Sequence, residues 1–210
     1  MPAIASPGRN CYDGIAFHSV WELTTVASHA LLSTVSIQDY LAGEQAREVR
    51  HEYIAGQLFA MVGTSRAHNT IAGNFFALLH THLRGSPCQV FMADMKVRVD
   101  KAEAFYYPDI VVTCEPRDDK ALFLNAPSLI VEVLSPATEN IDRREKRIAY
   151  QYLESLKEYV LVAQDRPQVE VYRRSHTGVW EVDIYESGET ATLSSLNLEL
   201  PLAVVYEGVG

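Results

Sequence analysis

The stretches YPDIVV at residues 107–112 and IVEVLS at residues 130–135 decide the fold, because each places one acidic residue in an apolar run. Short runs rich in Val and Ile predict β-strands. A buried carboxylate without a partner is costly, and two close together repel. Asp109 and Glu132 therefore predict a divalent-metal site built on this pair. The alternative is two acids that cap turns at strand ends.

The surrounding sequence predicts a mixed α/β fold. A helix at 139–156 separates the strand at 129–134 from a strand at 158–163, which indicates neighbouring parallel strands. The strand at 129–134 and three others are expected at the centre of one sheet. The remaining predicted elements are helices at 37–48 and 68–83, strands at 89–92, 95–99 and 106–113, and hairpins at 51–60 and 169–185.

Length and composition predict one domain. The 210 residues, of which 48% are hydrophobic, suffice for a single core. We expect the domain to cover 34–210 and an N-terminal extension to cover 1–33. The apolar segment 20–32 is interrupted by Glu22 and His29, so no signal peptide is expected. No run reaches the roughly 18 apolar residues of a membrane span, and no membrane partner is expected.

The charge balance limits how the chain could meet nucleic acid. Lys and Arg total 18 against 27 Asp and Glu, a net charge of −9, which argues against passive binding of many phosphates. The basic residues near 143–147 could touch a nucleic-acid backbone, although a solvated helix face is the commoner explanation. Lys96 and Arg98 share one face of a predicted strand, where they could be solvated or could face phosphate, and the solvated interpretation is favoured.

The three cysteines, Cys11, Cys88 and Cys114, are far apart and include no CxxC pair. They fit neither a disulfide framework nor a zinc ribbon. The simplest location for such a chain is a reducing cytoplasm.

Several motifs occur in a characteristic order along the chain. They are HEYIAGQL at 51–58, SRAHN at 65–69, Pro108-Asp109, EVLSPAT at 132–138, Asp142, Lys146, Tyr150 and EYVLV at 158–162. Through these motifs, the chain resembles the Uma-two family of the PD-(D/E)XK nuclease superfamily across roughly residues 36–174.

The resemblance implies a restriction-endonuclease-like fold and a metal-dependent DNA endonuclease that hydrolyses phosphodiester bonds. Asp109 and Glu132 would hold Mg²⁺, or Mn²⁺, with the backbone carbonyl of Val133 and the Glu52 carboxylate as further candidate ligands. Leu134 stands where the superfamily's acid-x-lysine signature has its lysine. The resemblance implies a relocated lysine, and Lys146 is our candidate for orienting water or stabilising charge.

Three further residues are candidates for substrate binding, namely His68, Arg143 and Tyr150. Simpler interpretations remain open. His68 could merely open a helix, Glu52 could be a solvated hairpin charge, and Lys146 could be an exposed helix lysine paired with Asp142. The alternative function is a catalytically degenerate nuclease-fold module that binds DNA or a protein partner. A homodimer would suit cleavage of both strands of a duplex.

Overall fold

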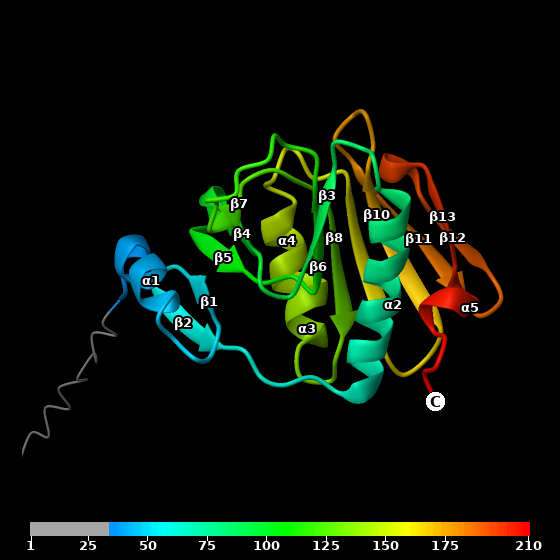
Figure 1. Cartoon of the computed structure of the whole chain (residues 1–210), viewed down its shortest axis with the longest axis horizontal. Coiled ribbons are helices and arrows are strands. Elements are labelled where there is room, and N and C mark those ends of the chain that lie inside the picture. Colours follow the sequence, from blue (N-terminus) through cyan, green and yellow to red (C-terminus); the bar gives the residue numbers. More distant parts are fainter. Residues whose placement is uncertain (1–33) are drawn as a thin grey trace, which may run out of the picture. The chain divides into compact units, whose positions relative to one another are not determined.

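Six strands form the larger sheet, in the order β11-β10-β9-β8-β6-β3 (Figure 1). The computed structural model describes residues 34–210, so the expected N-terminal extension lies outside the described part. β8 and β9 run parallel and the other pairs antiparallel, which confirms the predicted mixed sheet and its strand–helix–strand unit. The strands are β3 (Gln89–Met92), β6 (Ile110–Thr113), β8 (Pro127–Leu134), β9 (Glu158–Ala163), β10 (Gln168–Arg174) and β11 (Trp180–Glu186).

β8 is buried on both faces, as its nearly continuous apolar sequence requires. Helix α2 (Arg66–His82) packs on one face through Ile71, Phe75 and Leu79. The segment that contains α4 (Arg147–Tyr150) covers the other face, and the two helices lie on either side of β8 in Figure 1. Because alternate strand residues share a face, Glu132 points to the α4 side with Ile130 and Leu134.

A second, smaller sheet has the order β2-β1-β5-β4-β7. The prediction of one strand at 106–113 is wrong, since residues 104–106 belong to this sheet and residues 110–113 to the larger one. Pro108 lies between them and has no N–H to donate to a ladder. The expectation that residues 95–99 lie at the centre of the main sheet is also wrong, because residues 96–99 form a strand of this smaller sheet. The strands are β1 (His51–Ile54), β2 (Gln57–Ala60), β4 (Lys96–Val99), β5 (Ala104–Tyr106) and β7 (Phe123–Leu124).

The helix predicted at 139–156 is shorter and irregular. It consists of α3 (Glu139–Ile141), a π-helical turn η2 (Asp142–Lys146) and α4, which ends at Tyr150. Helix α1 (Ile37–Glu44) is likewise shorter than the predicted 37–48. In both cases the start of the helix agrees with the sequence pattern and its end does not.

Both predicted hairpins are present. The β1–β2 turn has positive φ at Ala55 (46°) and Gly56 (87°), the combination of a tight hairpin turn. In the second hairpin β10 pairs with β11, beginning with Gln168 opposite Glu186. The sequence pattern did not resolve the elements that follow the second hairpin, which are β12 (Thr190–Leu193), the 3₁₀ turn η3 (Ser194–Leu196), β13 (Leu198–Pro201) and α5 (Leu202–Val205). It also did not resolve the 3₁₀ turn η1 (Asp100–Ala102), between β4 and β5.

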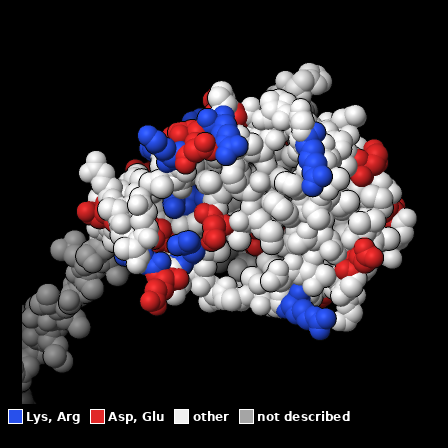
Figure 2. Space-filling model, viewed as in Figure 1, with Lys and Arg blue, Asp and Glu red and all other residues white. Residues whose placement is uncertain are grey.

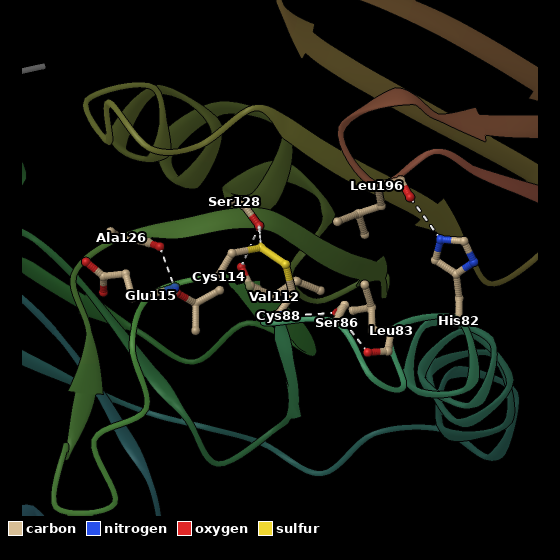
Figure 3. Close-up of a disulfide and its surroundings, with 11 residues drawn as sticks. His82, Leu83, Ser86, Cys88, Val112, Cys114, Glu115, Ala126, Ser128 and Leu196 are labelled. Atoms are coloured by element: carbon tan, nitrogen blue, oxygen red, sulfur yellow. Dashed lines mark hydrogen bonds between the residues drawn. A yellow bond between two sulfur atoms is a disulfide. The ribbon is translucent and has the colours of Figure 1, made fainter.

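Cys88 and Cys114 form a disulfide, which corrects the expectation that the cysteines are unpaired (Figure 3). The physical reason is strand register. Gln89 pairs with Thr113 in the antiparallel β3–β6 ladder, so the flanking Cys88 and Cys114 come to lie opposite each other. Within residues 34–210, no helix has the length and apolar character needed to cross a membrane.

Candidate active site

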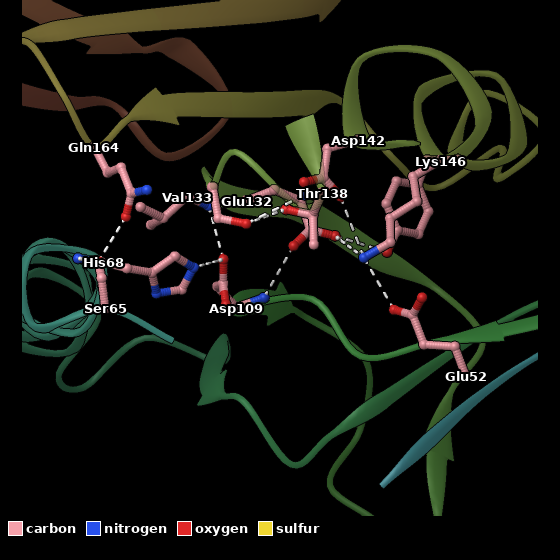
Figure 4. Close-up of polar contacts among 12 residues, drawn as sticks. Glu52, Ser65, His68, Asp109, Glu132, Val133, Thr138, Asp142, Lys146 and Gln164 are labelled. Carbon is pink, nitrogen blue, oxygen red and sulfur yellow. Dashed lines mark hydrogen bonds and ion pairs between the residues drawn. The ribbon is translucent and has the colours of Figure 1, made fainter. Parts of the chain in front are cut away.

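Asp109 and Glu132 meet where the chain passes from the smaller sheet into the larger one (Figure 4). Asp109 immediately precedes β6, and Glu132 lies in the neighbouring β8. The backbone N–H of Asp109 donates to Glu132 Oε2 at 3.3 Å, and the N–H of Val133 donates to Asp109 Oδ2 at 2.7 Å. Each carboxylate is therefore fixed by the backbone of the other acid's strand.

The two acids differ in their access to solvent. Glu132 is only 3% exposed, whereas the side chain of Asp109 is 20% exposed. Burial, opposed by the nearby Lys146 ammonium, raises the pKa of Glu132 well above its ordinary value, and Asp142, Asp109 and Glu52 raise it further. A second cation beside this pair would favour the ionised form of Glu132.

Lys146 is buried among three carboxylates, so its interpretation as an exposed helix lysine is wrong. Its Nζ lies 2.9 Å from Glu52 Oε1, 3.3 Å from Glu132 Oε1 and 3.3 Å from Asp142 Oδ1. Burial alone would lower the pKa of Lys146, but these three acids together raise it well above the ordinary value. The ammonium is therefore held in its charged form.

Glu52 reaches the site from β1 of the smaller sheet. Its Oε1 accepts from the backbone N–H of Tyr107 at 3.2 Å and pairs with Lys146. The side chain is 13% exposed, so the alternative of a solvated hairpin charge is wrong. Glu52 links the smaller sheet to the carboxylates of the larger one.

His68 contacts the Asp109 carboxylate from the first turn of α2. Its Nε2 lies 3.2 Å from Asp109 Oδ2, and its backbone N–H donates to the helix-capping Ser65 hydroxyl at 3.0 Å. Both interpretations of His68 thus describe the same residue: it opens the helix and it lies in the site.

The other two candidate substrate contacts are engaged within the protein. Tyr150 is fully buried, and its hydroxyl donates to Glu132 Oε1 at 3.2 Å. Arg143 pairs with Glu139 at 2.8 Å and with Glu170 of β10 at 2.7 Å. In this structure these residues support the site and the sheet, respectively.

Sequence reasoning missed two features. Asp142 appears in the family motif and was considered only as a surface partner of Lys146 at a spacing of four, but the pair is buried in the site. Lys96, expected to be solvated, is buried and donates to the Tyr107 hydroxyl at 3.2 Å, while that hydroxyl donates to Glu44 Oε1 at 3.2 Å. Glu44 lies in α1, and no sequence pattern predicted its burial.

The carboxylates of Asp109 and Glu132 suit a hard cation that takes few of its ligands from the protein. In the part of the chain that is described, no three or more His, Cys, Asp or Glu side chains are grouped to hold an ion. Mg²⁺, however, commonly binds through one or two carboxylates and retains several waters. The partly exposed Asp109 and the adjacent Glu132 match that requirement.

Comparisons with known proteins agree with the fold and with the resemblance. A family model, Uma2, described as "Putative restriction endonuclease", matches residues 37–204. The uncharacterized protein slr1290 of Synechocystis sp. is 34% identical over 176 residues, which are 83% of this chain and 93% of that protein. The uncharacterized protein sll1609 of the same organism is 29% identical over 154 residues, 72% of this chain and 87% of that protein.

A solved structure shows the same fold. It is the crystal structure of a protein from Anabaena variabilis described as a putative nuclease belonging to DUF820. The TM-score is 0.64 at 20% sequence identity, over 76% of this chain and 91% of that chain. The restriction-endonuclease-like α/β architecture expected from the sequence is thereby confirmed.

Proposed function

The chain belongs to the Uma2 family, and from that premise we propose that it is a divalent-metal-dependent endonuclease that hydrolyses phosphodiester bonds in DNA. The observation that carries the proposal is the pairing of Asp109 with Glu132 through backbone hydrogen bonds, beside a buried lysine. Lys146 offsets part of the charge of this pair, and a bound metal ion would supply the further positive charge that favours both ionised acids.

Asp109 and Glu132 would hold Mg²⁺ or Mn²⁺. The carbonyl of Val133 is a third candidate ligand, because the N–H and C=O of one strand residue point to the same side and the Val133 N–H already points to Asp109. Glu52 is a fourth candidate, directly or through water. When bound, the ion would lower the pKa of a water and neutralise charge on the scissile phosphate.

The protein's own groups would then orient the reaction. The Lys146 ammonium, fixed within 3.3 Å of Glu132 Oε1, would hold the attacking water and stabilise the negative charge that develops on phosphate. His68 would keep Asp109 oriented through its contact with Oδ2. Asp109, as the more exposed acid, lies on the side from which DNA would approach.

The alternative is a catalytically degenerate module of the same fold. It is favoured by Leu134, a buried residue at the position of the usual strand lysine, and by the net charge of −9. On the face shown in Figure 2, acidic and basic side chains are interspersed, and the described residues form no broad basic surface there. Such a module would bind DNA or a protein partner without cleaving phosphodiester bonds.

The experiment that separates the two functions is cleavage of an end-labelled linear DNA library by purified protein with Mg²⁺ or Mn²⁺. The endonuclease proposal predicts fragments with the wild type, and none with Asp109→Ala or with a chelator. DNA binding without fragments in either metal would favour the degenerate module. Cleavage of both strands would call for two copies of the chain, so a homodimer belongs to this proposal. The cytoplasmic location was inferred from the cysteines, and the Cys88–Cys114 disulfide removes that support.

A further inference from the structure

A single π-helical turn lies between α3 and α4, at Asp142–Lys146. Such turns are rare and are frequently found at functional sites. The hydroxyl of the buried Tyr159 donates to the backbone carbonyl of Asp142 at 3.0 Å. The irregular turn is thus anchored to β9 of the larger sheet.

Asp142, Lys146 and Tyr150 follow one another at a spacing of four, which places the three side chains on one side of the helical segment. All three face the sheet, and they are 2%, 6% and 0% exposed.

The ammonium of Lys146 has three N–H donors and three carboxylate neighbours. Glu52 comes from β1, Glu132 from β8 and Asp142 from the π-helical turn itself. Glu132 and Glu52 are the two that the proposed function assigns to the ion. Asp142 is therefore the acid that remains in contact with Lys146 when Glu52 and Glu132 bind a metal ion.

We propose that Asp142 is the positioning residue of Lys146. The ion pair itself follows from the contacts, whereas the choice of Asp142 over Glu52 and Glu132 rests on the proposed function. Asp142 itself touches neither substrate nor ion in this scheme. Its carboxylate holds the ammonium in place through the buried ion pair.

The test uses the full-length protein labelled with ¹⁵N on its lysine side chains. Exposed ammonium groups exchange their protons too fast to give a signal near neutral pH, whereas a buried, hydrogen-bonded ammonium gives a resolved peak, which Lys146→Arg would assign. Asp142→Asn removes the charge but keeps the side-chain size. Glu145→Gln is the matched control, because Glu145 is an exposed acid in the same turn.

The expected result is a Lys146 peak in the wild type and in Glu145→Gln, and its loss or displacement in Asp142→Asn. An unchanged peak in Asp142→Asn, or no peak in the wild type, would overturn the proposal. If circular dichroism shows that Asp142→Asn is unfolded, Asp142→Glu replaces it. That variant keeps the charge but shifts the carboxylate by one methylene, and it should displace the peak.

A second arm measures the consequence for cleavage. Loss of one partner of a buried ion pair predicts a fall in kcat of about tenfold or more for Asp142→Asn, with KM for DNA and metal affinity unchanged. Glu145→Gln should retain the wild-type rate. A wild type that cleaves no DNA would count against the proposed function alone, since the spectroscopic arm requires no catalysis.

Discussion

The backbone N–H of Asp109 donates to the carboxylate of Glu132 across 3.3 Å, at the junction of the two sheets. The position of Asp109 thus depends on β8, and that of Glu132 on the segment that enters β6. Because the geometry is set by backbone rather than by flexible side chains, substitution of either acid should change the chemistry of the site more than the fold. This relationship governs the first prediction.

Asp109→Asn should weaken Mg²⁺ or Mn²⁺ binding by at least about tenfold, because even residues that only support a ligand contribute about 10- to 100-fold to metal affinity. Titration calorimetry of the purified protein measures the change. Asp118→Asn, an exposed acid outside the site, is the control and should bind the ion as the wild type does. Equal affinities in all three proteins would remove Asp109 from the metal site.

His68→Ala should slow DNA cleavage by about 10- to 100-fold, the usual effect of losing a group that orients a metal ligand. The reason is the contact of 3.2 Å between His68 Nε2 and Asp109 Oδ2. His80→Ala alters an exposed histidine of the same helix and should leave the rate unchanged. Equal rates for the two variants would show that His68 only opens the helix.

Lys146→Met should destabilise the protein by about 3–5 kcal/mol near pH 8, because it leaves buried acids without their cation. The loss should shrink as the pH falls towards 5. Burial raises the pKa of Glu132 well above its ordinary value even with Lys146 present, so this group takes up a proton on folding. The cost of burying Glu132 therefore grows as the pH rises above the pKa that Glu132 has in the unfolded chain.

Urea unfolding at several pH values checks this dependence. Lys157→Met, at an exposed position, should change the free energy of unfolding by no more than about 0.5 kcal/mol at any of them. A destabilisation by Lys146→Met that is independent of pH would mean that the acids stay ionised without the lysine.

Cys88→Ser should lower the free energy of unfolding by about 3–4 kcal/mol in the absence of reductant, the amount expected for a cross-link over a separation of 26 residues. Reductant should remove the difference between the variant and the wild type. Peptide mapping without reductant should recover a linked pair containing Cys88 and Cys114. Recovery of only unlinked peptides would contradict the cross-strand disulfide.

The sequence predicted most strands of the larger sheet and singled out Asp109 and Glu132, because β-branched runs and ordered motifs are local signals. β3 and β9 were predicted with their observed limits. The separation of residues 106–113 into two sheets was not predicted. Pro108 marked a break in the ladder, but the pairing of β5 with β4 and β1 depends on distant residues.

The contacts of the site were less accessible to sequence reasoning. The pairing of Lys146 with Asp142 follows from their spacing of four, but the burial of both side chains emerges only in three dimensions. The Cys88–Cys114 disulfide depends on the β3–β6 register, which cysteine spacing alone does not fix. Lys96 is buried because Tyr107 and Glu44 supply polar partners from elsewhere in the chain.

The most direct measurement is the conversion of supercoiled plasmid to nicked and linear forms by wild-type protein and by Glu132→Ala, each purified identically and incubated with Mg²⁺ or Mn²⁺. A single cut in a plasmid changes its mobility, so even weak activity is visible. The account predicts metal-dependent conversion by the wild type and none by Glu132→Ala. Conversion at equal rates by both proteins, or by neither, would contradict an endonuclease centred on Asp109 and Glu132.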